Sequence, residues 1–179
     1  MTIGEARSDR PWERLGLRIL PDSPRSLGFA IIAGLAFGAY VALADTLIFH
    51  SVVPASQSMS GAPILQRFMH FIPPVLFDEI AFRLVAMSAV AWLLVALAGR
   101  RDWCFRAAIV FVAFVAYPAF HSGYLASLSF TPLVVSREIL LHGIAGLLWG
   151  HLYWKHGWLA ALAGHVAAHL SLEPMLGLL

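Results

Sequence analysis

Five apolar runs, each long enough to cross a lipid bilayer, constrain this chain more than any other feature. A membrane-spanning helix needs about 20 apolar residues, and such helices are expected over residues 27–49, 74–98, 104–128, 132–153 and 157–176. Charged residues make up only 12% of the chain, whereas a soluble domain carries about 25%. The sequence therefore predicts an all-α fold, a polytopic membrane helix bundle with about five transmembrane helices.

The 179 residues leave room for one membrane domain and a short tail. Residues 27–179 are expected to form a single transmembrane domain. Residues 1–26 carry five arginines among scattered Trp and Leu side chains. Two structures remain open for this tail: a short interfacial helix on an anionic leaflet, or a partly disordered basic segment. Cys104 is the only cysteine, so an intrachain disulfide is excluded.

The distribution of basic residues predicts the orientation of the chain. Of the 12 Lys and Arg residues, five lie in the N-terminal tail, three in residues 99–106, and one is Lys155. Only Arg67 lies on the opposite side. Because cytoplasmic loops carry the excess of Lys and Arg, the N-terminus is predicted to be cytoplasmic. These positions are typical of a membrane protein, and no nucleic-acid partner is expected.

Several local signals predict how the helices pack and end. Gly34-x-x-x-Gly38 in the first run indicates a small-residue packing stripe. Pro73-Pro74 favours a second helix that starts at residue 74 or 75, preceded by a short interfacial helix over residues 64–72. Pro118 is expected to bend the third helix. Asp45, near the far end of the first run, is interpreted as interfacial.

Three ionisable residues stand together at the head of the second run: Asp78, Glu79 and Arg83. A charged side chain at the centre of a membrane helix costs roughly 2.5–3.5 kcal/mol. Glu79 and Arg83 are four residues apart with the acid first, which favours an ion pair. Asp78 points about 100° away from Glu79. A structural ion pair would explain two of these residues but not the second acid.

Three histidines are expected at the same depth as these acids, in the outer half of the membrane. His165 and His169 are spaced so that both imidazoles can reach one Zn²⁺. With His121 and a carboxylate from Asp78 or Glu79 they form a candidate site for Zn²⁺ or another divalent metal, in which the other carboxylate acts as base on bound water. A metal-free site is the alternative, with a carboxylate as base and histidines stabilising the oxyanion. Each histidine could instead be an ordinary core residue.

A second polar cluster is expected in the fourth run. Arg137, Glu138 and His142 lie close together there, and Glu138 and His142 are four residues apart. This spacing favours a local ion pair within one helix.

The polar residues fall into three motifs on successive helices. The first reads Asp78-Glu79-x-x-x-Arg83, the second Tyr117-x-x-x-His121, and the third His165-x-x-x-His169. Their order resembles the CPBP intramembrane proteases, whose motifs are Glu-Glu-x-x-x-Arg, Phe-x-x-x-His and His-x-x-x-Asn/Asp. That family includes type II CAAX prenyl proteases and bacterial Abi-type proteins. The resemblance covers a core of about residues 75–171.

The resemblance implies a membrane hydrolase that cleaves peptide bonds with carboxylate- and histidine-activated water, often a metalloprotease. By this resemblance, Asp78 is the general base, and Glu79 and Arg83 organise the site. His121 and His165 activate water or bind metal, and His169 occupies the position of the family's oxyanion-stabilising Asn. The implied location is the bacterial inner membrane. The implied partners are membrane lipids and a peptide or membrane-protein substrate.

Two departures from the family pattern favour a second hypothesis. Asp78 is one methylene shorter than glutamate, so its carboxylate reaches over an ångström less far, and such misplacement can cost about a hundredfold in rate. His169 replaces Asn or Asp. The alternative is a catalytically inactive relative, a membrane subunit or assembly factor that binds partner subunits of a larger membrane complex.

Overall fold

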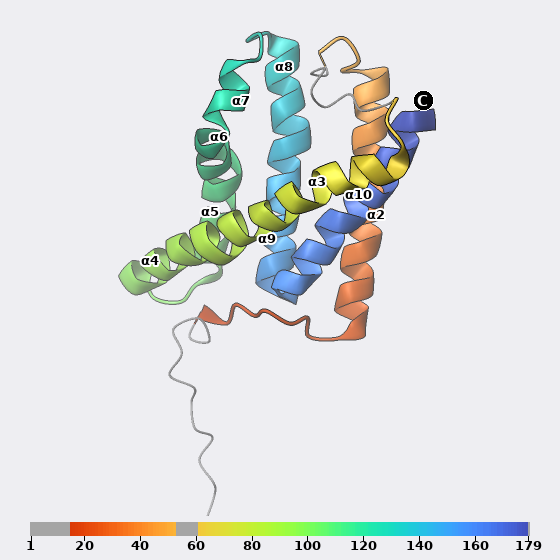
Figure 1. The fold of residues 1–179 in the computed structure, drawn as a ribbon. Coiled ribbons are helices and arrows are strands. Elements are labelled where there is room, and N and C mark those ends of the chain that lie inside the picture. Colours follow the sequence, from red (N-terminus) through yellow and green to blue (C-terminus); the bar gives the residue numbers. More distant parts are fainter. Residues whose placement is uncertain (1–14, 53–60, 179) are drawn as a thin grey trace, which may run out of the picture.

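The computed structural model describes residues 15–52 and 61–178, and all regular structure in these ranges is helical (Figure 1). Four helical segments are long and apolar enough to cross a membrane: Pro24–Leu47, Ile64–Ala98, Asp102–Phe120 and Pro132–His156. Many large apolar side chains are exposed on the outside of this bundle, as lipid-facing residues would be. The predicted all-α membrane bundle is confirmed.

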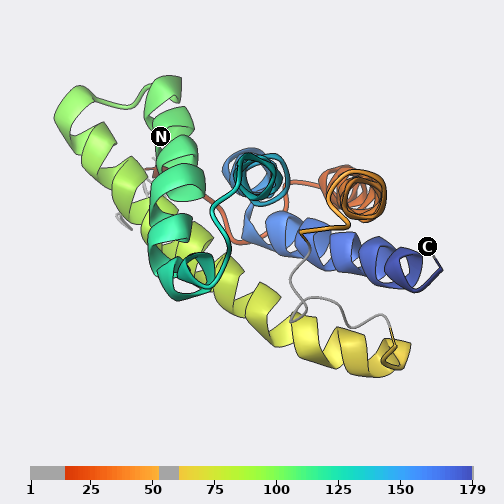
Figure 2. The ribbon, with the colours of Figure 1, turned by 90° about the horizontal axis from the view of Figure 1, so that it is seen from above.

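The last helix, α10 (Trp158–Leu178), has 21 residues and corresponds to the fifth expected span. It is not among the four apolar segments, because its sequence includes His165, His169 and Glu173. It crosses the bundle obliquely and packs mainly on α2 (Pro24–Leu47), with further contacts to α9 (Ile144–His156) and α3 (Ile64–Asp78) (Figure 2). The helix that carries His165 and His169 is therefore held against three other helices of the bundle.

Glycines allow α2 and α10 to approach each other closely. Gly34 and Gly38 are both buried, and a Cβ on either would overlap a backbone carbonyl oxygen of α10, that of Gly164 or Ala168. The packing stripe predicted from Gly34-x-x-x-Gly38 is confirmed. α2 itself begins at Pro24, where the Ser23 hydroxyl caps the helix by accepting from the Ser26 amide at 3.2 Å.

The second segment is one continuous helical rod of 35 residues. It consists of α3 (Ile64–Asp78), the π-helical η1 (Glu79–Met87) and α4 (Ser88–Ala98). At 1.5 Å per residue it is about 52 Å long, and it runs obliquely across the bundle (Figure 1). The predicted start at residue 74 or 75, after a separate interfacial helix, is wrong. The helix continues through Pro73-Pro74, and its first turn is anchored by buried Arg67, which pairs with Glu173 of α10.

Two further rods complete the bundle, and each contains a π-helical segment. The third comprises α5 (Asp102–Phe111), η2 (Val112–Ala116) and α6 (Tyr117–Phe120). The helix breaks at His121, three residues after Pro118, and resumes as α7 (Ser122–Ala126), so the span expected to reach residue 128 is interrupted. The fourth comprises α8 (Pro132–Arg137), η3 (Glu138–Gly143) and α9 (Ile144–His156).

The described part of the N-terminal tail packs against the bundle. Leu15 and Leu17 are buried in the main core, and the carbonyls of Arg18 and Ile19 accept hydrogen bonds from the first amides of α10, both at 2.9 Å. An interfacial helix is therefore not formed between residue 16 and residue 23. The remainder of the predicted tail, residues 1–14, lies outside the described residues.

Candidate functional site

A cavity of about 410 Å³ lies among α2, α3, α6, η3, α9 and α10. Apolar side chains such as Phe37, Val41 and Leu172 form much of its lining. Four predicted site residues line it: Asp78, His121, His165 and His169. The other ionisable lining residues are Asp45, His70, Tyr117, Tyr124, Arg137, His142 and Glu173. The first, second and third motifs therefore contribute to one cavity, through Asp78, His121, His165 and His169.

Glu79 lies behind the cavity wall and has no exposed surface. Its Oε1 is 2.9 Å from Nδ1 of His165, and its backbone carbonyl accepts a 3.0 Å hydrogen bond from the Trp158 indole. Its Oε2 is 3.8 Å from Nε of Arg83, so the predicted ion pair is present but long. With Nδ1 held by this carboxylate, Nε2 is the nitrogen of His165 left for chemistry.

Asp78 has a different environment from the other acids of the interior. It lines the cavity and has no hydrogen bond or ion pair within the described ranges, although His121, His165 and Arg83 interact with it electrostatically. The neighbouring acids are all paired: Asp45, Glu79, Glu138 and Glu173. Asp78 is thus the carboxylate whose oxygens are available to a molecule in the cavity.

His169 belongs to a buried network that links α3 to α10. Its Nδ1 is 3.2 Å from Oε1 of Glu173, whose Oε2 accepts from both Nε and Nη2 of Arg67 at 3.0 Å. Phe71 stacks on the imidazole at 5.1 Å between ring centroids. Sequence reasoning missed Glu173 and assigned Arg67 to an interfacial helix. The i, i+4 spacing of His169 and Glu173 was the available signal.

The histidine rings form a partly stacked row along one wall. His165 lies between Trp149, at 5.1 Å, and His169, at 5.6 Å between ring centroids. His121 is turned toward its own helix, with Nδ1 3.1 Å from the Tyr117 carbonyl oxygen and its ring 4.2 Å from the Tyr117 ring. Packing on both sides fixes the orientation of these imidazoles.

The predicted metal ligands Glu79, His121, His165 and His169 do not surround one point. Across residues 15–52 and 61–178, no three His, Cys, Asp or Glu side chains are grouped so that they could hold a metal ion. Nδ1 of each of these histidines approaches a carboxylate or a carbonyl oxygen.

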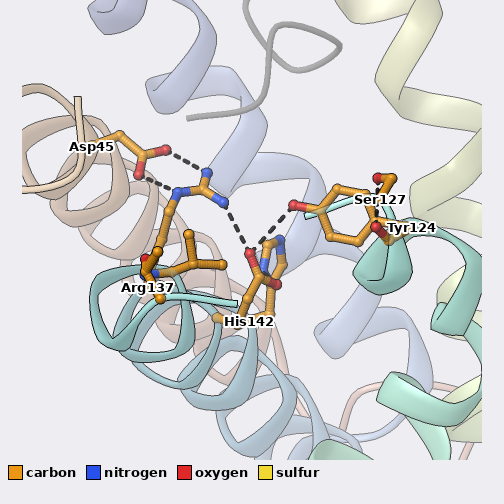
Figure 3. A network of polar contacts seen from close by, with 8 residues as sticks. Asp45, Tyr124, Ser127, Arg137 and His142 are labelled. Atoms are coloured by element: carbon orange, nitrogen blue, oxygen red, sulfur yellow. Dashed lines mark hydrogen bonds and ion pairs between the residues drawn. The ribbon is translucent and has the colours of Figure 1, made fainter. Parts of the chain in front are cut away.

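A second polar network, shown in Figure 3, contributes Asp45, Tyr124, Arg137 and His142 to the lining of the cavity. Arg137 binds Asp45 through two 2.8 Å hydrogen bonds and donates to Oε1 of Glu138 at 3.1 Å. Nδ1 of His142 is 2.7 Å from Oε2 of Glu138. The predicted cluster in the fourth span is confirmed. The interfacial assignment of Asp45 is wrong: it is buried, because Arg137 of α8 neutralises it across the helix interface.

Tyr124, on the short helix α7, completes this network. Its hydroxyl donates to Oε1 of Glu138 at 3.3 Å. Burial and the nearby Glu138 carboxylate raise the pKa of Tyr124 to about 12. The phenol therefore remains protonated and acts as a hydrogen-bond donor at physiological pH.

The fold and the site together define an all-α membrane bundle with a polar cavity in its interior. Comparison with known protein families, curated proteins and solved structures finds no match.

Proposed function

We propose that this chain is an intramembrane hydrolase of the CPBP protease type, which cleaves peptide bonds with water activated by Asp78. The observation that carries the proposal is the environment of Asp78: a carboxylate without a hydrogen-bond or ion-pair partner in the described chain, facing a cavity of about 410 Å³. The three motifs that resemble that family support the same assignment.

The proposed reaction needs only water and the side chains around the cavity. Asp78 takes a proton from water as general base, and the water oxygen attacks the carbonyl carbon of the peptide bond. Nε2 of His165 accepts a hydrogen bond from the attacking water and orients it, while its Nδ1–H donates to the Glu79 carboxylate, which holds the ring in position. The carbon–nitrogen bond then breaks, and the proton held by Asp78 passes to the leaving amine. The products are one carboxylic acid and one amine.

The other motif residues have supporting roles in this proposal. Arg83 holds Glu79 from the side opposite His165, and His121 and His169 complete the polar wall around the reacting carbonyl. The apolar part of the cavity suits a peptide or membrane-protein segment with apolar side chains.

We place the protein in a bacterial inner membrane with its N-terminus in the cytoplasm and its cavity toward the outer half. The positive-inside distribution of Lys and Arg supports this orientation. Single cysteines introduced at Arg100 and Gly61 test it in a Cys104→Ser background. A membrane-impermeant reagent applied from outside should label the second and not the first, and the reverse pattern would contradict the assignment.

A reconstituted cleavage assay tests the proposed hydrolase. Wild-type protein in lipid vesicles is incubated with a library of membrane-inserting peptides, and products are identified by mass spectrometry. Asp78→Asn should lower the rate about 10²–10⁴-fold, the usual contribution of a general base. Asp102→Asn removes an exposed acid at the start of α5 and should retain the wild-type rate. Wild-type rates in Asp78→Asn, or no cleavage by the wild type, would refute the proposal.

A catalytically inactive membrane subunit or assembly factor is the second candidate, and one observation favours it. Asp45, Glu79, Glu138 and Glu173 are all neutralised by neighbouring side chains, as a purely structural role would require. This candidate predicts that partner subunits co-purify in fixed stoichiometry. It also predicts that His165→Ala leaves assembly and cellular function unchanged.

A further inference from the structure

A second, smaller cavity of about 60 Å³ shares walls with the large one, and we call it the inner chamber. It is lined by Asp78, Phe82, Arg83, Tyr117, His142, Ala145, Gly146, Trp149 and His165. Asp78, Trp149 and His165 line both cavities. The inner chamber is thus placed beside the carboxylate to which the hydrolytic role is assigned.

The Trp149 indole is a buried hydrogen-bond donor of this chamber. The side chain is only 1% exposed, and its Nε1 has no hydrogen-bond partner within the described part of the chain. Its ring is held between His165, at 5.1 Å, and Phe37, at 5.6 Å between centroids. Buried polar groups in native proteins are nearly always bonded to protein or to ordered water. The Trp149 N–H therefore calls for a small acceptor beside it.

Arg83, on the π-helical segment η1, also indicates that a small polar molecule binds in the chamber. It is 4% exposed, and its Nε donates no hydrogen bond to any described group. The nearest acid oxygen, Oε2 of Glu79, lies 3.8 Å away and is also without a hydrogen bond in the described ranges. A polar separation beyond about 3.5 Å is commonly bridged by water.

The size and the polar lining of the chamber are suited to water. Water takes up about 30 Å³ in the liquid, and each buried water needs two to four polar partners. A chamber of about 60 Å³ is larger than the about 10–15 Å³ that one water molecule needs, so it has room for water. Asp78, Arg83, Tyr117 and the Trp149 N–H supply donors and acceptors for this water.

We propose that the inner chamber binds water and stores the water that Asp78 activates. The storage role rests on the proposed hydrolase function, because hydrolysis inside a bilayer consumes water, which the hydrocarbon core excludes. Trp149 is a positioning residue in this scheme. Its N–H binds a stored water, and its ring orients His165.

Water-edited solid-state NMR tests the occupancy directly, on wild-type protein in lipid vesicles without substrate. The six tryptophans are labelled with ¹⁵N, and Trp149→Phe identifies the signal of Trp149. Magnetisation from water should reach the Trp149 indole at least as fast as the Trp158 indole. Trp158 is the reference, because it is partly exposed and its N–H already donates to the Glu79 carbonyl at 3.0 Å. Transfer to Trp149 that is several-fold slower than transfer to Trp158 would overturn the proposed water site. Because no cleavage is measured, this result is independent of whether the protein is a hydrolase.

A kinetic comparison tests the storage role where cleavage is observed. Trp149→Phe keeps an aromatic ring but removes the N–H, and it should lower kcat about tenfold with KM unchanged. Trp154→Phe is the control, because Trp154 stacks on Phe105 and lines neither cavity. An unchanged kcat in Trp149→Phe would overturn the storage role.

Discussion

The ion pair between Asp45 and Arg137 allows a sharp test of the interior electrostatics. Their side chains are 7% and 4% exposed, and two 2.8 Å hydrogen bonds join them across α2 and α8. Removing one partner of a buried pair costs about 3–5 kcal/mol, because the other charge is left uncompensated. Arg137→Met leaves buried Asp45 without its partner and should reach this full range, although Glu138 keeps its contacts with Tyr124 and His142.

Asp45→Leu should be milder, because Arg137 keeps its 3.1 Å contact with Glu138. A cost of about 1–3 kcal/mol is expected, that of a buried polar group losing one partner. The double variant Asp45→Leu/Arg137→Met should be less destabilised than the sum of the single variants. The expected coupling is about 0.5–3 kcal/mol.

Equilibrium unfolding in mixed micelles, followed by far-ultraviolet circular dichroism, measures these differences. Arg25→Met removes an exposed arginine at the start of α2 and should change the free energy of unfolding by less than about 0.5 kcal/mol. The reasoning is refuted if Arg137→Met costs no more than Asp45→Leu. It is equally refuted if the single effects are additive.

Three further predictions use the same unfolding assay. Gly34→Ala should lower the free energy of unfolding by at least about 1–3 kcal/mol, because its Cβ would overlap the Gly164 carbonyl oxygen. Gly28→Ala is the control: its Cβ meets no neighbouring atom within 4 Å, so the change should be neutral or stabilising. Glu173→Gln should cost about 3–5 kcal/mol by leaving buried Arg67 without its carboxylate, and an effect no larger than that of Asp102→Asn would contradict this. Chelation by EDTA should leave the unfolding midpoint and any cleavage unchanged. If EDTA instead removes stoichiometric Zn²⁺ and abolishes activity, His121, His165 and His169 move together around a metal.

The sequence predicts the fold class and part of the site for a physical reason. Apolar runs of span length have few folded alternatives to helices, and ionisable residues in such runs face the bundle interior. That is why Asp78, His121, His165 and His169 could be assigned to one region before the fold was known. The structure places all four around one cavity.

What could not be predicted depends on pairing between distant segments. Arg67 and Glu173 are 106 residues apart in the chain, and each alone is typical of an interfacial residue. Their ion pair anchors the first turn of α3, so tertiary contact overrides the local signal of Pro73-Pro74. Asp45 was misassigned for the same reason, since its partner Arg137 is 92 residues away.

The three acid–histidine pairs around the cavity have the same type of contact, and this contact bears on whether the protein is an enzyme or a scaffold. Glu79, Glu138 and Glu173 each approach Nδ1 of a histidine, at 2.9, 2.7 and 3.2 Å respectively. These contacts help to fix the orientation of the imidazoles, which a reaction that moves protons needs. The unpaired carboxylate of Asp78 beside these oriented histidines favours chemistry over packing.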